Sequence, residues 1–524
     1  MDDPAVGGFS DRFPHSLARD LLMIDGLLLA LTPALLAMTL AGVCLGIIWG
    51  ALPGLSTTMA MGLLIGLSAG MSQDVAISFM LGVYTGSVFG GAISAVLINI
   101  PGTPDAVPTM IEGHQLAQRG EGGQALGMSI AASFVGGGIG IILLVTFIPL
   151  ILSFALNFKS WEMFWLAVIG IMVAGTMAAG SIPLKGWIAG WLGMLVAFVG
   201  LDSIHAVPRF TFGTFALFDG ISYVAVLIGL FGFAEILRTL PARDMPTIPS
   251  RVGRVIPPLK LLGRYMPAAA RSGILGTFIG AIPGAGANVA SFLAYDIGRR
   301  RAKPEERDKW GKGSYQALVC AETANNANIG GSMLPTLALG IPGNAAAAAL
   351  LAALTLKNVV VGPTIEVDHP GLIYFIYAAL IVANVMMYLA AFALIGPCVK
   401  LFSLPRGILM PLILPVCVIG AYAVKLSIFD VWIMFAAGLV GWLFSIFKFP
   451  VAPVVLGVIL APLADENFRR SLLLFEGKGV GFVLSQWIGT FLMLAVLFVL
   501  IEGAIRVAAN ARARRQPGSE PAGT

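Results

Sequence analysis

The sequence predicts an all-α polytopic membrane protein with about 10 to 12 spanning or half-spanning helices in two repeats. Three observations predict this class: an apolar composition, long stretches without charge, and two matching sets of Pro-Gly pairs. Hydrophobic residues make up 58% of the 524 residues and charged residues only 11%, whereas soluble domains carry about 25% charged residues. This composition indicates that lipid surrounds most of the chain.

Several stretches without Asp, Glu, Lys or Arg are long enough to cross a bilayer, which takes about 20 residues. They are residues 26–73, 75–104, 122–158, 272–295, 323–356, 371–399 and 479–501. As one helix, residues 26–73 would extend about 72 Å at about 1.5 Å per residue, against about 30 Å of hydrocarbon. The chain must therefore reverse, and Pro53-Gly54 is where it is expected to do so.

Two further breaks follow from similar arguments. Residues 323–356 are interrupted at Pro342-Gly343, after which Asn344 is a predicted helix N-cap. Residues 272–295 have basic clusters on both sides, and basic loops are typically cytoplasmic. We therefore expect a re-entrant hairpin that turns at Pro283-Gly284. The alternative is a simple span that places one cluster outside.

The uneven charge also predicts the organisation of the chain. Basic residues gather between Arg238 and Arg271, between Arg299 and Lys312, and in the C-terminal tail. The predicted parts are an N-terminal tail (1–20), membrane repeat 1 (21–240), a basic cytoplasmic loop (241–271), membrane repeat 2 with C-terminal helices (272–505) and a basic cytoplasmic tail (506–524). Each cluster lies beside an apolar segment, which favours a membrane-flanking role over nucleic-acid binding.

The repeat is visible as paired motifs. The segment from Gly46 to Gly54 matches the segment from Gly276 to Gly284, and Ile100-Pro101-Gly102 matches Ile341-Pro342-Gly343. Interrupted apolar segments at matching positions of two halves are typical of a transporter binding site. Basic charge flanks only the second hairpin, which favours inverted over parallel repeats. The regularly spaced glycines within these segments are also explained by helix packing alone.

Each break creates a helix N-terminus, whose free N–H groups and dipole attract anions. The candidate substrate-binding residues lie at or next to the breaks, and helix capping is the alternative role for their polar side chains. They are Pro53, Gly54, Ser56, Thr57, Thr58, Asn99, Pro101, Gly102, Thr103, Pro283, Gly284, Gly286, Asn288, Pro342, Gly343 and Asn344. Asp105 and Glu112, just beyond the second break, are expected to be solvated loop residues.

A second polar cluster lies in an otherwise Gly/Ala-rich stretch: Glu322, Asn325, Asn326 and Asn328. Such residues are costly in a membrane unless they are paired or functional. Amide and carbonyl oxygens suit a hard cation such as Na⁺, and Glu322 is a candidate proton carrier. The alternative is a structural turn whose amides satisfy each other. No other metal site, no cofactor site and no catalytic motif is recognisable, so an enzyme is not expected.

Taken together, the motifs resemble the large membrane subunit of the tripartite tricarboxylate transporters, the TctA type. The resemblance rests on residues 50–54, 82–91, 99–103, 112–113, 280–286, 321–326 and 339–343, and extends over roughly residues 25 to 500. It implies a secondary transporter for tricarboxylates or related carboxylates in the bacterial inner membrane, driven by a sodium or proton gradient. It also implies two partners, a small TctB-type membrane subunit and a periplasmic TctC-type binding protein. An ion channel and an intramembrane enzyme are the alternatives.

Overall fold

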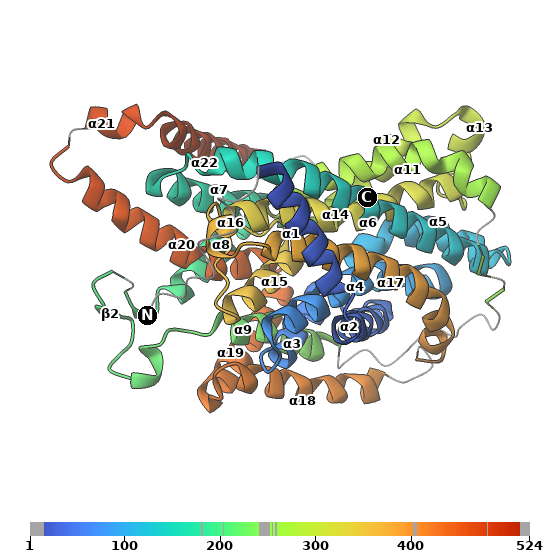
Figure 1. Cartoon of the computed structure of the whole chain (residues 1–524), viewed down its shortest axis with the longest axis horizontal. Coiled ribbons are helices and arrows are strands. Elements are labelled where there is room, and N and C mark those ends of the chain that lie inside the picture. Colours follow the sequence, from blue (N-terminus) through green and yellow to red (C-terminus); the bar gives the residue numbers. More distant parts are fainter. Residues whose placement is uncertain are drawn as a thin grey trace. The chain divides into compact units, whose positions relative to one another are not determined.

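The described residues of the computed structural model are helical almost throughout (Figure 1). They are residues 15–179, 182–202, 204–239, 252–253, 255–256, 259–401, 406–478 and 480–513. Among them, 6 helices are long and apolar enough to cross a membrane: α2 (Pro33–Ala51), α4 (Gln73–Ile98), α6 (Gly122–Ala155), α7 (Ser160–Ala178), α17 (Leu372–Leu401) and α19 (Ile428–Ile446). Shorter apolar helices accompany them, so the chain is a multi-pass helical membrane protein.

The chain divides into two compact units, Met1–Leu156 with Val224–Trp442, and Asn157–Tyr223 with Leu443–Thr524. The first unit also contains α1 (His15–Ala30), α3 (Thr57–Ser68), η1 (Pro104–Ala106), α5 (Val107–Gln118), α9 (Tyr223–Leu227), the π-helix η3 (Ile228–Phe233), α10 (Ala234–Thr239), α11 (Leu259–Gly280), α12 (Gly286–Arg301), α13 (Pro304–Arg307), α14 (Tyr315–Leu339), α15 (Ala345–Leu356), α16 (Ile365–Asp368) and α18 (Arg406–Lys425). The second unit combines residues from both predicted repeats. Unit boundaries and the predicted sequence halves therefore differ.

Within the first unit, small residues allow α2 and α4 to pack backbone to backbone. A Cβ added to Gly46 would lie 2.5 Å from the carbonyl oxygen of Val83, and one added to Gly86 would lie 2.3 Å from that of Val43. Contacts this short require glycine. The regularly spaced glycines of α2 thus have the packing role that the sequence offered as an alternative.

The helix pair α11 and α14 repeats this packing at the matching positions. A Cβ on Gly276, the counterpart of Gly46, would lie 2.3 Å from the carbonyl oxygen of Ala324. The C-terminal caps of α4 and α14 also match, because both cap residues, Asn99 and Gly340, have positive φ values, 57 and 69. The two halves therefore share backbone geometry as well as sequence motifs.

Within this unit, each half also contributes a long helix that packs against the other half. The long helix α6 of the first half packs against α14 and α11, whereas α17 of the second half packs against α4 and α2. The short helix α3 contacts α15, and η1 contacts α12. Each half therefore lies against the broken helices of the other, and their most buried polar residues are brought together.

The second unit is built from α7, α8 (Pro183–Ala197), α20 (Ala452–Phe475) and α22 (Trp487–Ala513), with α21 (Val480–Ser485). After α8, the segment Asn157–Tyr223 continues with β1 (Gly200–Leu201), β2 (Pro208–Arg209) and η2 (Phe215–Leu217). The two short strands pair antiparallel. They belong to a surface connection rather than to a sheet core.

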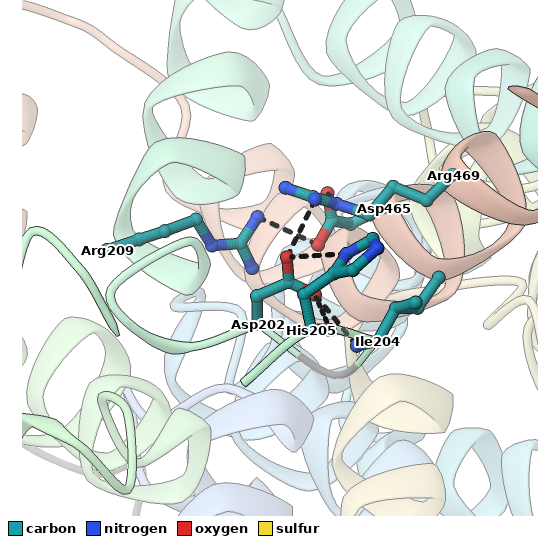
Figure 2. A network of polar contacts seen from close by, with 6 residues as sticks. All are labelled: Asp202, Ile204, His205, Arg209, Asp465 and Arg469. Carbon is teal, nitrogen blue, oxygen red and sulfur yellow. Dashed lines mark hydrogen bonds and ion pairs between the residues drawn. The ribbon is translucent and has the colours of Figure 1, made fainter. Parts of the chain in front are cut away.

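A network of charges fastens this connection to α20 (Figure 2). The carboxylate of Asp202 accepts a hydrogen bond from the Ile204 N–H at 2.7 Å and forms an ion pair with Arg469 at 2.7 Å. Asp465 pairs with Arg209 at 2.9 Å and with Arg469 at 3.1 Å. The network joins the β1–β2 connection to one face of α20.

Three predicted boundaries fall within helices, since α1 begins at His15, before residue 20, and α22 continues past residue 505 to Ala513. The predicted basic loop covers residues 241–271, but α11 already begins at Leu259. Lys260, Arg264 and Arg271 therefore lie on a helix. Most of residues 241–258, and the tail residues 514–524, lie outside the described residues.

Candidate functional site

The four Pro-Gly pairs of the repeated motifs lie in short connections between helices. They separate α2 from α3, α4 from η1, α11 from α12 and α14 from α15. Gly54 and Gly284 have φ values of 90 and 79, a region that favours glycine. Each break therefore ends one helix and presents the N-terminus of the next.

The two breaks of each half lie against each other. In the second half, the N–H of Gly284 donates to the carbonyl oxygen of Gly343 at 2.8 Å. A Cβ on Gly343 would lie 2.6 Å from the carbonyl oxygen of Gly280, and one on Gly102 would lie 2.0 Å from that of Gly50. Any side chain at Gly102 or Gly343 would clash with the last turn of α2 or α11, so glycine is what lets the two breaks of each half lie this close.

One hydrogen-bonded cluster joins the halves through Tyr84 of α4. Its hydroxyl lies 3.0 Å from Ser332 Oγ and accepts from Asn344 Nδ2 at 2.9 Å. Asn344 Nδ2 also lies 3.0 Å from Asn328 Oδ1, while Asn344 Oδ1 accepts from the Ala347 N–H at 2.8 Å. The predicted N-cap is confirmed, and the same amide contacts a residue of the other half.

A second contact joins the halves in the opposite direction. The buried carboxyl of Asp105 lies near the side chains of Thr103 and Asn325 without a hydrogen bond to either. Asn325 is the repeat counterpart of Tyr84, and Thr103 is the counterpart of Asn344. Residues that follow each half's second Pro-Gly pair therefore approach the middle of the other half's long helix.

A third cluster surrounds Glu322, which is fully buried. Its carboxylate accepts hydrogen bonds from the Thr109 hydroxyl and, at 3.0 Å, from the Ser133 hydroxyl. Asn326 Nδ2 donates to the Ser133 hydroxyl at 2.8 Å. Because α14 is continuous from Tyr315 to Leu339, the proposed alternative of a structural turn at this cluster is wrong.

Several buried polar atoms of these clusters have no hydrogen-bond partner within the part of the chain that the structure describes. They are Thr103 Oγ1, Asp105 Oδ2, both polar side-chain atoms of Asn325, Asn326 Oδ1 and Asn328 Nδ2. Buried polar groups are normally satisfied, and exceptions call for an explanation. Oxygen-rich groups of this kind suit a small cation or a polar substrate.

The remaining predicted residues are placed differently. Ser56 caps α3 by accepting from the Met59 N–H at 3.1 Å, and the Thr57 hydroxyl is buried without a partner among the described residues. Thr58 is half-buried, and Pro53 and Pro342 are buried, whereas Pro101, Pro283 and Gly286 are partly exposed. Asn99 and Asn288 are exposed, and neither belongs to the three buried clusters described above.

The expectation that Asp105 and Glu112 are solvated is wrong, because they are 7% and 0% exposed. Glu112 on α5 accepts hydrogen bonds from the N–H groups of Gly311, Gly313 and Ser314, at 2.6, 3.0 and 2.7 Å. These N–H groups precede α14 and form an anion site. Glu112 thus ties the first half to the start of the long helix of the second.

Sequence reasoning missed Tyr84, Ser332, Thr109 and Ser133 as members of the site. Their partners are far away in the sequence, and each residue is ordinary in a membrane helix. The usable signal was the presence of Tyr84 and Glu112 within the motif segments. The glycine-rich run 311–314, whose N–H groups donate to Glu112, was a second usable signal.

Comparison with known families matches residues 36–456 to the family described as the tripartite tricarboxylate transporter TctA family. An Agrobacterium vitis protein, named an uncharacterized 52.8 kDa protein in the TAR-I ttuC' 3'region, is 33% identical over 474 residues, which cover 90% of this chain and 94% of that protein. An uncharacterized protein in the TAR-II ttuC' 3'region of the same organism is 30% identical over 227 residues, 43% of this chain and 93% of that protein. No solved structure matches.

Proposed function

The chain belongs to the TctA family, the membrane component of the tripartite tricarboxylate transporters, and from this premise we propose that it is the permease subunit that imports tricarboxylates or related organic carboxylates. The family is one of transporters and not of enzymes. The observation that carries the proposal is the pairing of four helix breaks around buried clusters to which both halves contribute. A carboxylate substrate would meet helix N-termini from each half at once.

Substrate carboxylates would bind at the residues that follow the breaks. The candidates are Gly54 to Thr58, Gly102-Thr103, Gly284 to Asn288 and Gly343-Asn344. Free N–H groups at helix starts stabilise negative charge without a full cation nearby. Asn344 supports this role, because its amide is held within reach of Tyr84 and Asn328 at a helix start.

The coupling ion would bind beside the substrate on α14. Glu322, Asn325, Asn326 and Asn328 are buried, and three of them have unpartnered polar atoms among the described residues. Amide and carboxylate oxygens are suitable Na⁺ ligands, and Glu322 is suited to bind a proton instead. The nearby carboxyl of Asp105 adds to the attraction for a cation and, by repulsion, restricts where the substrate carboxylates bind.

The transport cycle would alternate access to this site between the two sides of the membrane. We infer inverted repeats, with the α11–α12 hairpin and its counterpart α2–α3 entering from opposite faces. The partners would be a TctB-type small membrane subunit and a TctC-type periplasmic binding protein that delivers substrate. The C-terminal tail would lie in the cytoplasm of a bacterial cell with an inner membrane.

The test is uptake of radiolabelled citrate into liposomes that contain this chain with its small subunit and binding protein. A sodium gradient and a proton gradient are imposed in turn, and each protein component is omitted in turn. We expect uptake that depends on one gradient and disappears without the binding protein. No gradient-dependent uptake across a panel of carboxylates would refute the substrate class, and a passive conductance would favour a channel.

A further inference from the structure

The α11–α12 hairpin carries a second polar feature, away from the clusters described above. A cavity of about 310 Å³ lies between α11, α12 and α14, and Arg271 and Arg301 contribute to its lining. Both arginines are exposed. Nearby Arg264 and Arg300 pair with Glu306 and Asp296. Arg271 and Arg301, in contrast, form no salt bridge with any acidic residue that the structure describes.

The lining residues follow one stripe on each helix. On α11 the lining extends from Ala268 to Phe278. Counted from Arg271, the lining residues Ile274, Leu275 and Phe278 follow at three, four and seven positions. On α12 the lining residues Ala294, Ile297, Gly298 and Arg301 repeat this spacing in the reverse order. Because α12 returns alongside α11, both arginines lie farther from the Pro283-Gly284 turn than the apolar lining residues Ile274, Phe278 and Ile297.

The cavity therefore changes from charged to apolar along its length. Seven residues of helix correspond to about 10 Å. At the apolar end, Ile274 and Phe278 are 45% and 50% exposed, so the apolar surface continues from the cavity to the exposed surface of the hairpin. A ligand that satisfies both parts has an anionic head and an apolar tail.

We propose that this cavity binds the headgroup of an anionic phospholipid, with an acyl chain lying along Ile274 and Phe278. Two unpaired arginines at one end match a phosphate that carries a net negative charge. A free carboxylate has no part that would contact the exposed apolar stripe. The site is independent of the transported substrate, so its test does not depend on the transport assignment.

The test measures binding of radiolabelled phosphatidylglycerol to the full chain in detergent, with phosphatidylcholine as the neutral probe. The double variant R271Q/R301Q should bind phosphatidylglycerol at least about tenfold more weakly than the unmodified chain, because two cationic contacts are lost. The matched control R299Q/R307Q removes the same charge from exposed arginines that do not line the cavity. It should bind within about twofold of the unmodified chain.

Gel filtration of each variant establishes that it is folded, and the single variants R271Q and R301Q replace the double variant if it is not. Each single variant should then bind about threefold more weakly. Equal loss in the control variant, or equal binding of phosphatidylcholine, would overturn the proposal. Displacement of bound lipid by citrate or by inorganic phosphate would instead identify a site for free anions and would also overturn it.

Discussion

Asn344 illustrates how single residues at a helix break serve two purposes. Its Oδ1 atom caps α15, a role that any small oxygen-bearing side chain can perform. Its Nδ2 atom faces Tyr84 and Asn328, which no cap requires. The Oδ1 atom also accepts from the Tyr84 hydroxyl at 3.1 Å, but the donor contact with Asn328 belongs to Nδ2 alone, so substitution can separate this contact from capping.

The substitution Asn344→Asp keeps the capping oxygen but removes the amide donor and adds a negative charge. We expect stability to stay within about 1 kcal/mol, because Asp and Asn are comparable N-caps. Carboxylate uptake should fall at least about tenfold, because an anion would then occupy the proposed anion site. Uptake in liposomes and thermal unfolding measure the two effects, and unchanged uptake would contradict the assigned role.

Glu322 is the one carboxylate of the proposed ion cluster on α14. The substitution Glu322→Gln preserves size while it removes the charge and one acceptor of the hydrogen bonds from Thr109 and Ser133. We expect gradient-driven uptake to fall at least about tenfold, since the cation or proton loses its anionic partner. The control Glu305→Gln changes an exposed residue of α13 and should leave uptake unaltered. Equal uptake by both variants would exclude Glu322 from coupling.

At the scale of elements, the glycines of α2 and α4 determine how closely two long helices approach. The substitution Gly86→Ala would place a Cβ 2.3 Å from a backbone oxygen, which side-chain movement cannot relieve. We expect destabilisation of about 1–3 kcal/mol from overpacking. The measurement is the thermal unfolding midpoint of the purified variant in detergent.

The matched control is Gly138→Ala in α6, where an added Cβ meets nothing within 4 Å. In a helix interior, alanine is favoured over glycine by up to about 1 kcal/mol. The control midpoint should therefore stay the same or rise. If the two variants unfold alike, close packing of α2 against α4 is not what these glycines provide.

In the second unit, the connection that contains β1 and β2 depends on charge. The N–H groups of Ile204 and His205, followed by Arg469 and Arg209, hold the pKa of Asp202 below its usual value. A lowered pKa in the folded state stabilises the network above about pH 4, the ordinary Asp value. This stabilisation is lost as the pH falls through the lower folded pKa.

Hydrogen exchange at the Ile204 amide tests this dependence (Figure 2). Protection factors, which are corrected for the intrinsic pH effect, should stay constant from pH 7 to about pH 4 and decrease below that. The Asp202→Asn variant should show reduced protection already at pH 7, because the ion pair with Arg469 is lost. Protection that is the same in the variant would show that charge does not hold this connection.

At the scale of the whole molecule, the paired motifs predict where the long helices of the first unit are broken. The helix breaks at Pro53-Gly54 and Pro342-Gly343, and the cap at Asn344, follow from local chemistry that any single sequence displays. Local reasoning also identified Glu322 and its neighbouring asparagines, since buried amides stand out in an apolar stretch.

What the sequence did not predict depends on contacts between distant segments. Asp105 and Glu112 look like loop residues because polar residues near a break are usually solvated. They are buried because η1 and α5 pack against α12 and α14 of the second half as well as against α4. The hydrogen bond between Tyr84 and Asn344, which are 260 positions apart, likewise depends on packing between the two halves.

The central claim is that one site, built by both halves, couples a carboxylate to a cation. The most direct measurement records labelled citrate and cation entry together, as ²²Na⁺ or as protons, in the same reconstituted vesicles. We predict a fixed ratio of cation to carboxylate in the unmodified protein and loss of both fluxes in the Glu322→Gln variant. Carboxylate entry without any cation flux, or with a flux that does not change in the variant, would contradict the claim.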